Sequence, residues 1–229
     1  MTARCKSMLS VLAAVAGTLL PISGAARAEA EFKEALIYLE RNVADDDIEV
    51  RIVAKTDDTG FAALRVIAPD GRIVIDVMSP ASRLGVRRLD LESPEPRDKD
   101  LVIADFPEGA YRFNAVLVDG STLRAEATLR HALPDAPVLS VPSDGQRDLP
   151  AKGAEVRWEP VAAAAAIQVV VKERKGLREL RTTLPGNATA FPIPDGFLVP
   201  GSKYELAVGA IHESGNRSYQ ETEFTANER

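Results

Sequence analysis

The residue types that most often perform nucleophilic or metal chemistry are scarce in this chain of 229 residues. It contains two histidines, His131 and His212, and one cysteine, Cys5. A nucleophile needs a base beside it, and neither histidine lies in a Gly-x-Ser-x-Gly elbow or a His-Glu-x-x-His helix. Two distant histidines without a neighbouring cysteine do not supply a zinc site either. We therefore interpret both histidines as surface residues and predict no catalytic residue, no cofactor and no enzymatic activity.

Carboxylates are the remaining groups that could bind a ligand directly. Asp45, Asp46 and Asp47 are followed at a short distance by Asp57 and Asp58, and oxygen ligands of this kind suit calcium. The spacing lacks the Gly and Glu of an EF-hand loop, so a solvated turn is favoured over a calcium site. The 34 acidic residues also form many pairs of the kind used in glycoside hydrolysis. Aromatic residues make up 5% of the chain, which leaves little for a sugar-binding platform.

The charge of the chain argues against two classes of partner. Its formal net charge is −6 at pH 7. An acidic protein has little electrostatic reason to approach nucleic acid or an anionic membrane surface. We therefore predict that it binds neither.

The N-terminus has the pattern of a secretory signal peptide. Arg4 and Lys6 precede an apolar run over residues 8–20, and small residues stand at Ala26 and Ala28. This pattern predicts a signal peptide over residues 1–28 that is removed by cleavage after Ala28, and the apolar run is short for a membrane span. The mature chain then has no cysteine and no membrane span. We predict an exported protein, periplasmic or secreted, in a bacterial envelope.

The first part of the mature chain has the pattern of an all-β domain, which we place at residues 29–133. Short apolar segments rich in Val, Ile and Leu alternate with turn signals such as Pro69-Asp70-Gly71 and Asp119-Gly120, which is typical of a sandwich or barrel. A helical stripe also fits Phe32, Ala35, Leu36, Leu39 and Val43, but we predict a strand over residues 35–40. The predicted strands cover residues 35–39, 48–54, 61–68, 73–78, 84–91, 101–104, 111–118 and 123–129.

The second part of the chain contains a more specific motif. Residues 198–204 read Leu-Val-Pro-Gly-Ser-Lys-Tyr, followed by an alternating apolar run, and the single Trp lies upstream in a short strand pattern. A Tyr that follows a turn at the start of a strand is typical of a tyrosine corner, in which the Tyr hydroxyl forms a hydrogen bond with the backbone a few residues upstream. We interpret five residues as structural, with no role in binding. They are Trp158, Leu198, Pro200, Gly201 and Tyr204.

Together these residues resemble a fibronectin type III domain over residues 134–229. The resemblance implies an antiparallel sandwich with a buried Trp158, and it implies little about what is bound, because the fold hosts many functions. The predicted strands cover residues 138–141, 154–158, 165–172, 177–183, 188–193, 204–211 and 218–225.

A weaker form of the corner occurs in the first domain. Pro107 is followed four residues later by Tyr111, as Pro200 is followed by Tyr204. This echo predicts that residues 29–133 form a sandwich that resembles an immunoglobulin-like domain more loosely. Pro134 and Pro137 cannot donate to a strand ladder and mark a stiff linker between the domains. The predicted fold is therefore all-β, with two tandem antiparallel sandwiches after a signal peptide.

We infer a non-enzymatic binding or scaffolding protein with a protein or glycan partner in the cell envelope. Sandwiches bind partners through loops and exposed sheet edges. The loop that carries His212, Glu213 and Arg217 is the candidate partner-binding surface, and we expect its three side chains to face solvent. The alternative is an accessory module that binds glycan or cell wall in a polysaccharide-active system.

Overall fold

The computed structural model describes residues 31–96 and 98–227. The predicted signal peptide lies outside this part of the chain. Within the described residues, no helix has the length and apolar character that crossing a membrane requires.

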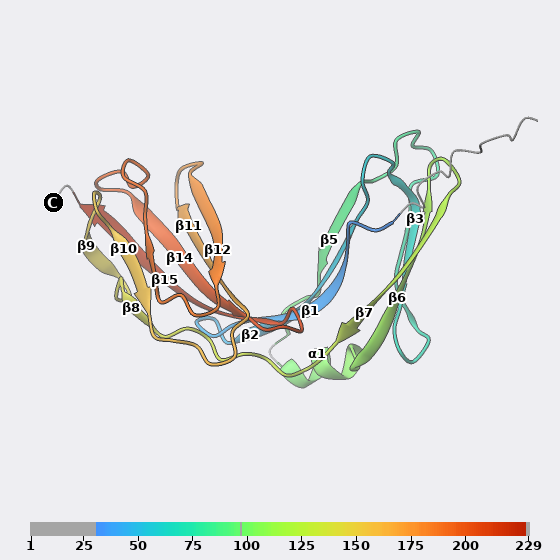
Figure 1. Cartoon of the computed structure of the whole chain (residues 1–229), viewed down its shortest axis with the longest axis horizontal. Helices are drawn as coiled ribbons and strands as arrows, with labels where there is room; N and C mark the ends of the chain where they lie inside the picture. The colour runs from blue at the N-terminus through green and yellow to red at the C-terminus, as the bar shows by residue number, and fades with distance from the viewer. Residues whose placement is uncertain (1–30, 97, 228–229) are drawn as a thin grey trace, which may run out of the picture.

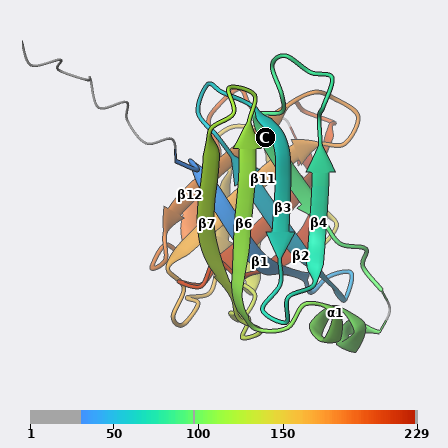
Figure 2. The same cartoon turned by 90° about the vertical axis from the view of Figure 1, so that its right-hand side faces the viewer.

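The first half of the chain folds into two packed sheets. Strands β1, β2 and β5 form one layer, and strands β4, β3, β6 and β7 form the other in that order (Figure 2). The elements are β1 (Glu34–Asn42), β2 (Asp47–Lys55), β3 (Phe61–Ile67), β4 (Ile73–Met78), β5 (Arg88–Glu92), α1 (Lys99–Asp105), β6 (Gly109–Leu117) and β7 (Thr122–Leu129).

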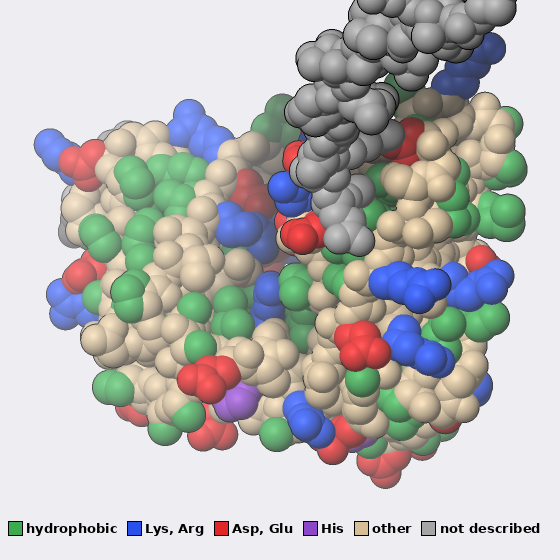
Figure 3. Space-filling model, turned by 45° about the vertical axis from the view of Figure 1, so that its right-hand side comes forward, with side chains coloured by type: hydrophobic (Ala, Val, Ile, Leu, Met, Phe, Trp, Pro, Cys, Tyr) green, Lys and Arg blue, Asp and Glu red, His purple; other side chains and the backbone are tan. Residues whose placement is uncertain are grey.

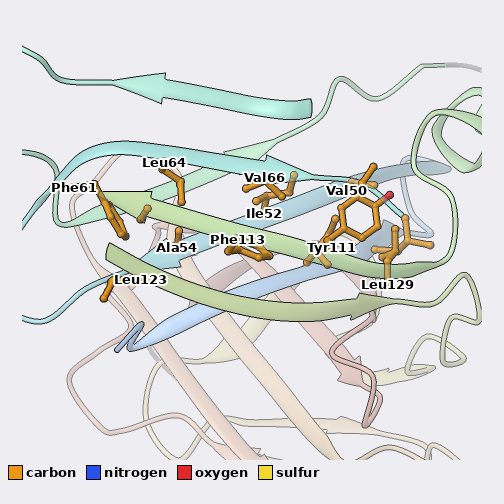
Figure 4. Close-up of a cluster of buried hydrophobic side chains, with 14 of the residues drawn as sticks. Val50, Ile52, Ala54, Phe61, Leu64, Val66, Tyr111, Phe113, Leu123 and Leu129 are labelled. Atoms are coloured by element: carbon orange, nitrogen blue, oxygen red, sulfur yellow. The ribbon is translucent and has the colours of Figure 1, made fainter. Parts of the chain in front are cut away.

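The core of this sandwich comes from alternate residues of its strands, because successive side chains of a strand point to opposite faces. Val50 and Ile52 of β2 face Phe113 of β6 and Val66 of β3 across the space between the layers (Figure 4). Strand β1 follows the same alternation, with Ile37 and Leu39 buried in this cluster. The strand predicted over residues 35–40 is present, and its apolar period is two.

A short helix replaces one predicted strand. We expected a strand over residues 101–104, and this prediction is wrong, because Lys99–Asp105 forms α1. The Asp98 side chain caps the helix by accepting a hydrogen bond from the Asp100 backbone N–H, which satisfies one of the donors that a helix start leaves free. Val102 is the buried residue of the helix. Four apolar residues are too few for their periodicity to separate a strand from one helical turn.

The second half of the chain forms another pair of sheets. Strands β13, β10 and β8 form one layer, and β12, β11, β14 and β15 form the other (Figure 1). The elements are β8 (Leu139–Val141), β9 (Gln146–Pro150), β10 (Glu155–Trp158), β11 (Ala166–Glu173), β12 (Glu179–Pro185), β13 (Ala190–Pro192), β14 (Lys203–Ile211) and β15 (Arg217–Asn227). Strand β9 was not predicted, and it pairs with the last part of β15.

Trp158 lies in the core of this second sandwich with 3% of its surface exposed. Its indole N–H donates to the Ala188 carbonyl at 2.8 Å, so the polar atom of the ring has a partner inside the fold. Tyr204 is fully buried and stacks on Phe224, with ring centroids 5.4 Å apart.

The two halves share one plan, in which a three-stranded layer packs on a four-stranded layer. Each half has a tyrosine corner at the start of one strand of its four-stranded layer, β6 in the first half and β14 in the second. The Tyr204 hydroxyl accepts a hydrogen bond from the Val199 backbone N–H at 2.8 Å. The Tyr111 hydroxyl donates to the Pro107 carbonyl at 3.0 Å. Each tyrosine thus bonds to the backbone four or five residues upstream, as a tyrosine corner does. The fold is two antiparallel β-sandwiches.

The sandwiches are joined edge to edge. Strand β1 of the first pairs in parallel with the start of β15 of the second, with Glu40 opposite Arg217 and Asn42 opposite Tyr219. The Val43 backbone N–H donates to the Tyr219 carbonyl at 3.0 Å. One continuous sheet therefore runs β12-β11-β14-β15-β1-β2-β5 through both sandwiches. Figure 1 shows it as a bent layer, with β15, β1 and β2 at the bend and the two cores on its outer side.

Candidate functional site

The concave face of this continuous sheet forms a groove of about 710 Å³ between the sandwiches. Charged side chains of both signs lie in the hollow between the two halves (Figure 3). We call it the inter-sandwich groove. Twenty residues line it, namely Glu34, Leu36, Tyr38, Glu40, Asn42, Asp45, Asp47, Glu49, Arg51, Val53, Arg88, Asp90, Glu95, Gln168, Val170, Arg181, Ala207, Arg217, Tyr219 and Glu221.

Strand alternation delivers these side chains to the groove. In β1, Tyr38 and Glu40 line the groove, whereas Ile37 and Leu39 lie in the core on the other face. Strands β2, β11 and β15 behave in the same way, and each contributes residues two positions apart. The polar face of the sheet, which a single sandwich would expose to water, becomes the lining of a cleft here.

Arg51 organises the charges at the β2 and β5 side of the groove. Its guanidinium lies 3.3 Å from a Glu49 oxygen, 2.8 Å from an Asp90 oxygen and 2.7 Å from a Glu92 oxygen. Glu49 is 8% exposed, and burial raises its pKa to about 7 although Arg51 works in the other direction. Burial also opposes the charge of Asp90, but its hydrogen bond from Arg51 keeps the pKa of Asp90 below its ordinary value.

A second network crosses the junction between the sandwiches. The guanidinium of Arg217 lies over the ring of Tyr38, 4.3 Å from its centroid, which is the geometry of a cation–π contact. The Tyr219 hydroxyl donates to the side-chain oxygen of Gln168 at 2.7 Å, and Arg181 donates to the same oxygen at 3.2 Å. Burial raises the pKa of Tyr219 to about 12, so its hydroxyl remains a donor at neutral pH.

The end of the groove near the β1–β2 turn is acidic. Asp45, Asp47, Glu95 and Glu221 line it, with Glu40 nearer the junction. The charge of Asp47 is the largest cause that raises the pKa of Glu95. Burial raises the pKa of Glu40 and of Glu221, and the charges of Asp45 and Asp47 add to the effect at Glu221. Carboxylates at this end thus disfavour one another's ionised forms.

Asn216 ties the two sandwiches together beside the junction. It is fully buried, its side-chain oxygen accepts from the Leu39 backbone N–H at 2.9 Å, and its amide group donates to the carbonyls of Arg130 and Ala132, each at 2.7 Å. One side chain of the β14–β15 loop therefore binds both β1 and the segment that links the sandwiches. Gly215 precedes it with φ of +90°, a conformation that glycine adopts at little cost.

The structure changes the interpretation of the loop that was expected to bind a partner. Glu213 is exposed and His212 is half-buried, with its Nδ1 3.0 Å from the Ser214 hydroxyl. Arg217 was expected to face solvent, and this is wrong, because it is half-buried over Tyr38 in the groove. The loop turns toward the first sandwich, since Asn216 is bonded there.

The predicted acidic turn has other partners than calcium. Asp45 accepts from the Asn42 side-chain amide at 2.9 Å, Asp47 accepts from the Asn42 backbone N–H at 3.2 Å, and Asp46 forms an ion pair with Lys99. Among residues 31–96 and 98–227, no three His, Cys, Asp or Glu side chains gather in a way that could hold a metal ion. In the structure, the three aspartates of this turn are therefore engaged with groups of their own chain.

The groove chemistry is that of ion pairing and hydrogen bonding. Its twenty lining residues include no Ser, Thr, Cys or His, so the described groove has no pair of a nucleophile and an imidazole base. His131 lies elsewhere, with its Nε2 2.8 Å from the Phe106 carbonyl. Sequence reasoning missed the groove, because its walls meet only through the pairing of β1 with β15.

Comparisons with known proteins find similar solved structures and no matching family. No family model matches the chain, and no curated protein matches it. Solved structures similar to it include the fibronectin(III)-like modules of Clostridium thermocellum CbhA, with 10% identity, a TM-score of 0.35, and coverage of 86% of this chain and 94% of that one. With its buried Trp158 and the hydrogen bond between Tyr204 and Val199, the second sandwich is fibronectin type III-like.

Two animal structures are similar to the same extent. The FN1-FN3 domains of chicken CNTN1 match with 10% identity and a TM-score of 0.34, covering 87% of this chain and 65% of that one. A segment of two fibronectin type III domains from chicken tenascin matches with 13% identity and a TM-score of 0.31, covering 86% of this chain and 97% of that one. These identities bear on the fold alone, and a fibronectin type III-like fold does not specify a ligand.

Proposed function

We propose that this protein is an exported, non-enzymatic binding module that holds a protein partner in the inter-sandwich groove. The pairing of β1 with β15 carries the proposal, because it turns two polar sheet faces into opposite walls of one cleft. Neither sandwich contains the groove alone. A fixed junction presents a preformed surface, which lowers the ordering cost of binding.

The contacts at the junction support a fixed arrangement of the walls. Asn216 bonds to the first sandwich and to the linker, and Arg217 packs on Tyr38. Asn216 is the last residue of the loop that leads into β15, and Arg217 is the first residue of that strand. The loop that the sequence suggested as a binding surface therefore supports the groove, and its exposed tip at Glu213 remains a secondary candidate.

The groove favours a protein partner over the glycan alternative. Sugar rings stack on the open faces of aromatic side chains, and the two groove tyrosines, Tyr38 and Tyr219, are 6% and 7% exposed. One face of the Tyr38 ring is covered by Arg217. The remaining lining is rich in charge, which suits the polar and ionic groups of a polypeptide.

The test uses one large side chain placed inside the groove and one placed outside it. Leu36 lines the groove with 43% of its surface exposed, and Leu177 is fully exposed between β11 and β12. Each is replaced by Trp, and envelope proteins captured by the wild type and both variants are compared. We expect Leu36→Trp to lose a captured protein that Leu177→Trp retains.

Two results would contradict the proposal. One is a set of captured proteins that is unchanged by Leu36→Trp, since the groove would then play no part in capture. The other is equal loss from Leu177→Trp at unchanged stability, since the binding surface would then include the β11–β12 loop.

A further inference from the structure

We propose that the partner segment held in the inter-sandwich groove is a basic stretch of polypeptide that carries several Lys or Arg side chains. This inference rests on the proposed function and names the chemistry of its ligand. Three features of the groove support the inference. Acidic side chains outnumber basic ones, most of the basic side chains already have ion-pair partners, and the two sandwiches enclose the charges between two walls.

The groove has twice as many acidic as basic side chains. Eight carboxylates line it against four guanidinium groups. Three of these guanidinium groups are engaged in ion pairs. Arg51 pairs with Glu49, Asp90 and Glu92. Arg88 pairs with Glu34 and Asp90, and Arg181 pairs with Glu179.

The surplus carboxylates are those at the junction and at the acidic end. Within the described part of the chain, Glu40, Glu95 and Glu221 form no ion pair with Lys or Arg at 4 Å or less. The nearby lysine, Lys99, is paired with Asp46 outside the groove lining. These three carboxylates are therefore available to a ligand that brings its own positive charge.

The shape of the groove strengthens the effect of this surplus. Both walls are packed sandwiches of low polarisability, and such walls focus the field of the charges between them. The charge of Asp47 raises the pKa of Glu95, and no described Lys or Arg lies within ion-pair distance of the Glu95 carboxylate. A bound ammonium or guanidinium group would relieve this repulsion, so the same charges that disfavour one another favour a cation.

The groove already accommodates guanidinium groups of its own chain in two ways. Arg51 lies among carboxylates, and the guanidinium of Arg217 lies over an aromatic ring. Both modes are common in the recognition of basic segments. Further carboxylates beside these groups extend the same chemistry toward the acidic end.

The size of the groove fits a polypeptide better than a small cation. Alternate residues of β1 line the groove from Glu34 to Asn42, and a strand of nine residues is about 30 Å long. An extended chain advances about 3.3 Å per residue, so a segment of roughly six to nine residues spans it. No group of acidic side chains within residues 31–96 and 98–227 is arranged to hold a single metal ion.

The experiment measures the binding of two labelled peptides by fluorescence anisotropy. One alternates Lys with Gly, the other alternates Glu with Gly, and both are long enough to span the groove. We expect the lysine peptide to bind at least about tenfold more tightly to the wild type, and this preference to shrink between about 50 mM and 300 mM salt, because salt screens charge attraction.

A matched pair of variants locates the binding. Glu40→Gln, Glu95→Gln and Glu221→Gln together remove the surplus carboxylates. Glu126→Gln, Asp148→Asn and Glu159→Gln together remove the same charge from exposed positions outside the groove. We expect the groove variant to bind the lysine peptide about tenfold more weakly and the control variant to change little. The thermal midpoint of each variant checks its folding. If the triple groove variant unfolds, the double variant Glu95→Gln with Glu221→Gln replaces it in the binding measurement.

The outcomes separate this inference from the proposed function. Four results would overturn the inference that the partner segment is basic. They are equal binding of both peptides, tighter binding of the glutamate peptide, no binding of either peptide, and an equal loss of lysine-peptide binding in both triple variants. None of these results changes the capture experiment with Leu36→Trp and Leu177→Trp. The groove would then remain the proposed binding surface with a partner of other chemistry.

Discussion

Replacement of Asn216 by Ala should strongly destabilise the junction between the sandwiches. The side chain makes three hydrogen bonds to backbone groups of Leu39, Arg130 and Ala132, and the residue is fully buried. Each such bond contributes about 0.5 to 1.5 kcal/mol net, and a buried group left without a partner costs more. We therefore expect Asn216→Ala to lower the free energy of unfolding by about 2 to 4 kcal/mol.

Urea denaturation with two signals measures this loss and locates it. Trp158 fluorescence reports on the second sandwich, and far-ultraviolet circular dichroism reports on both. We expect the midpoint to fall, because Asn216 holds β1 and the linker in place. Glu213→Ala in the same loop is the control, because this side chain is exposed, and it should change the free energy of unfolding by less than about 0.5 kcal/mol.

The isosteric variant Asn216→Asp tests the assignment of the amide group. The change keeps an oxygen that can accept from Leu39, but it places a carboxylate oxygen where the two carbonyls of Arg130 and Ala132 need a donor. We expect Asn216→Asp to be at least as destabilising as Asn216→Ala near neutral pH. A variant as stable as the wild type would refute the reasoning, since the two carbonyls would then not depend on the amide.

Four further predictions concern the cores, the charges and export. Trp158→Ala should cost about 3 to 5 kcal/mol, and native emission at the wavelength of an exposed indole would contradict its burial. Tyr204→Phe and Tyr111→Phe should each cost about 1 to 2 kcal/mol by urea denaturation, and no loss at either position would show that its corner hydroxyl does not stabilise that sandwich. Folding raises the pKa of Glu49 from 4.5 to about 7, so the folded protein binds a proton that the unfolded chain has lost. The free energy of unfolding should therefore fall by about 1 to 2 kcal/mol as the pH rises from 5 to 8. Glu49→Gln should reduce this dependence of stability on pH. Exported protein should begin at Glu29 by mass spectrometry, and an intact leader would contradict the cleavage site.

Local patterns were enough to predict the sandwich class of both halves. The corner at Tyr204 needs a turn and a strand within seven residues, and the hydrogen bond from Val199 is made within that span. Alternation in β1 and β2 also indicated strands, because one face of each is apolar. The strand prediction over residues 101–104 was wrong because four apolar residues carry no usable period.

The groove could not be predicted from such patterns. Glu40 and Arg217 are opposite each other across the junction, and nothing near either residue indicates the other. Polar residues on alternate positions of β1, such as Glu40, are ordinarily the solvent face of a sheet. Arg217 was assigned to an exposed loop because the last strand was predicted to begin at residue 218, whereas β15 begins at Arg217. Only the parallel pairing of two strands far apart in the chain converts these surfaces into a lining.

The parallel pairing of β1 with β15 also determines how the protein would respond to mechanical tension. In a parallel pair, the start of one strand and the end of the other lie at opposite ends of the ladder. The start of β1 at Glu34 and the end of β15 at Asn227 therefore lie on opposite sides of the junction. A pull on the two ends loads the interstrand hydrogen bonds along their length together, in shear, so that the paired residues from Glu40 to Asn42 resist as a unit.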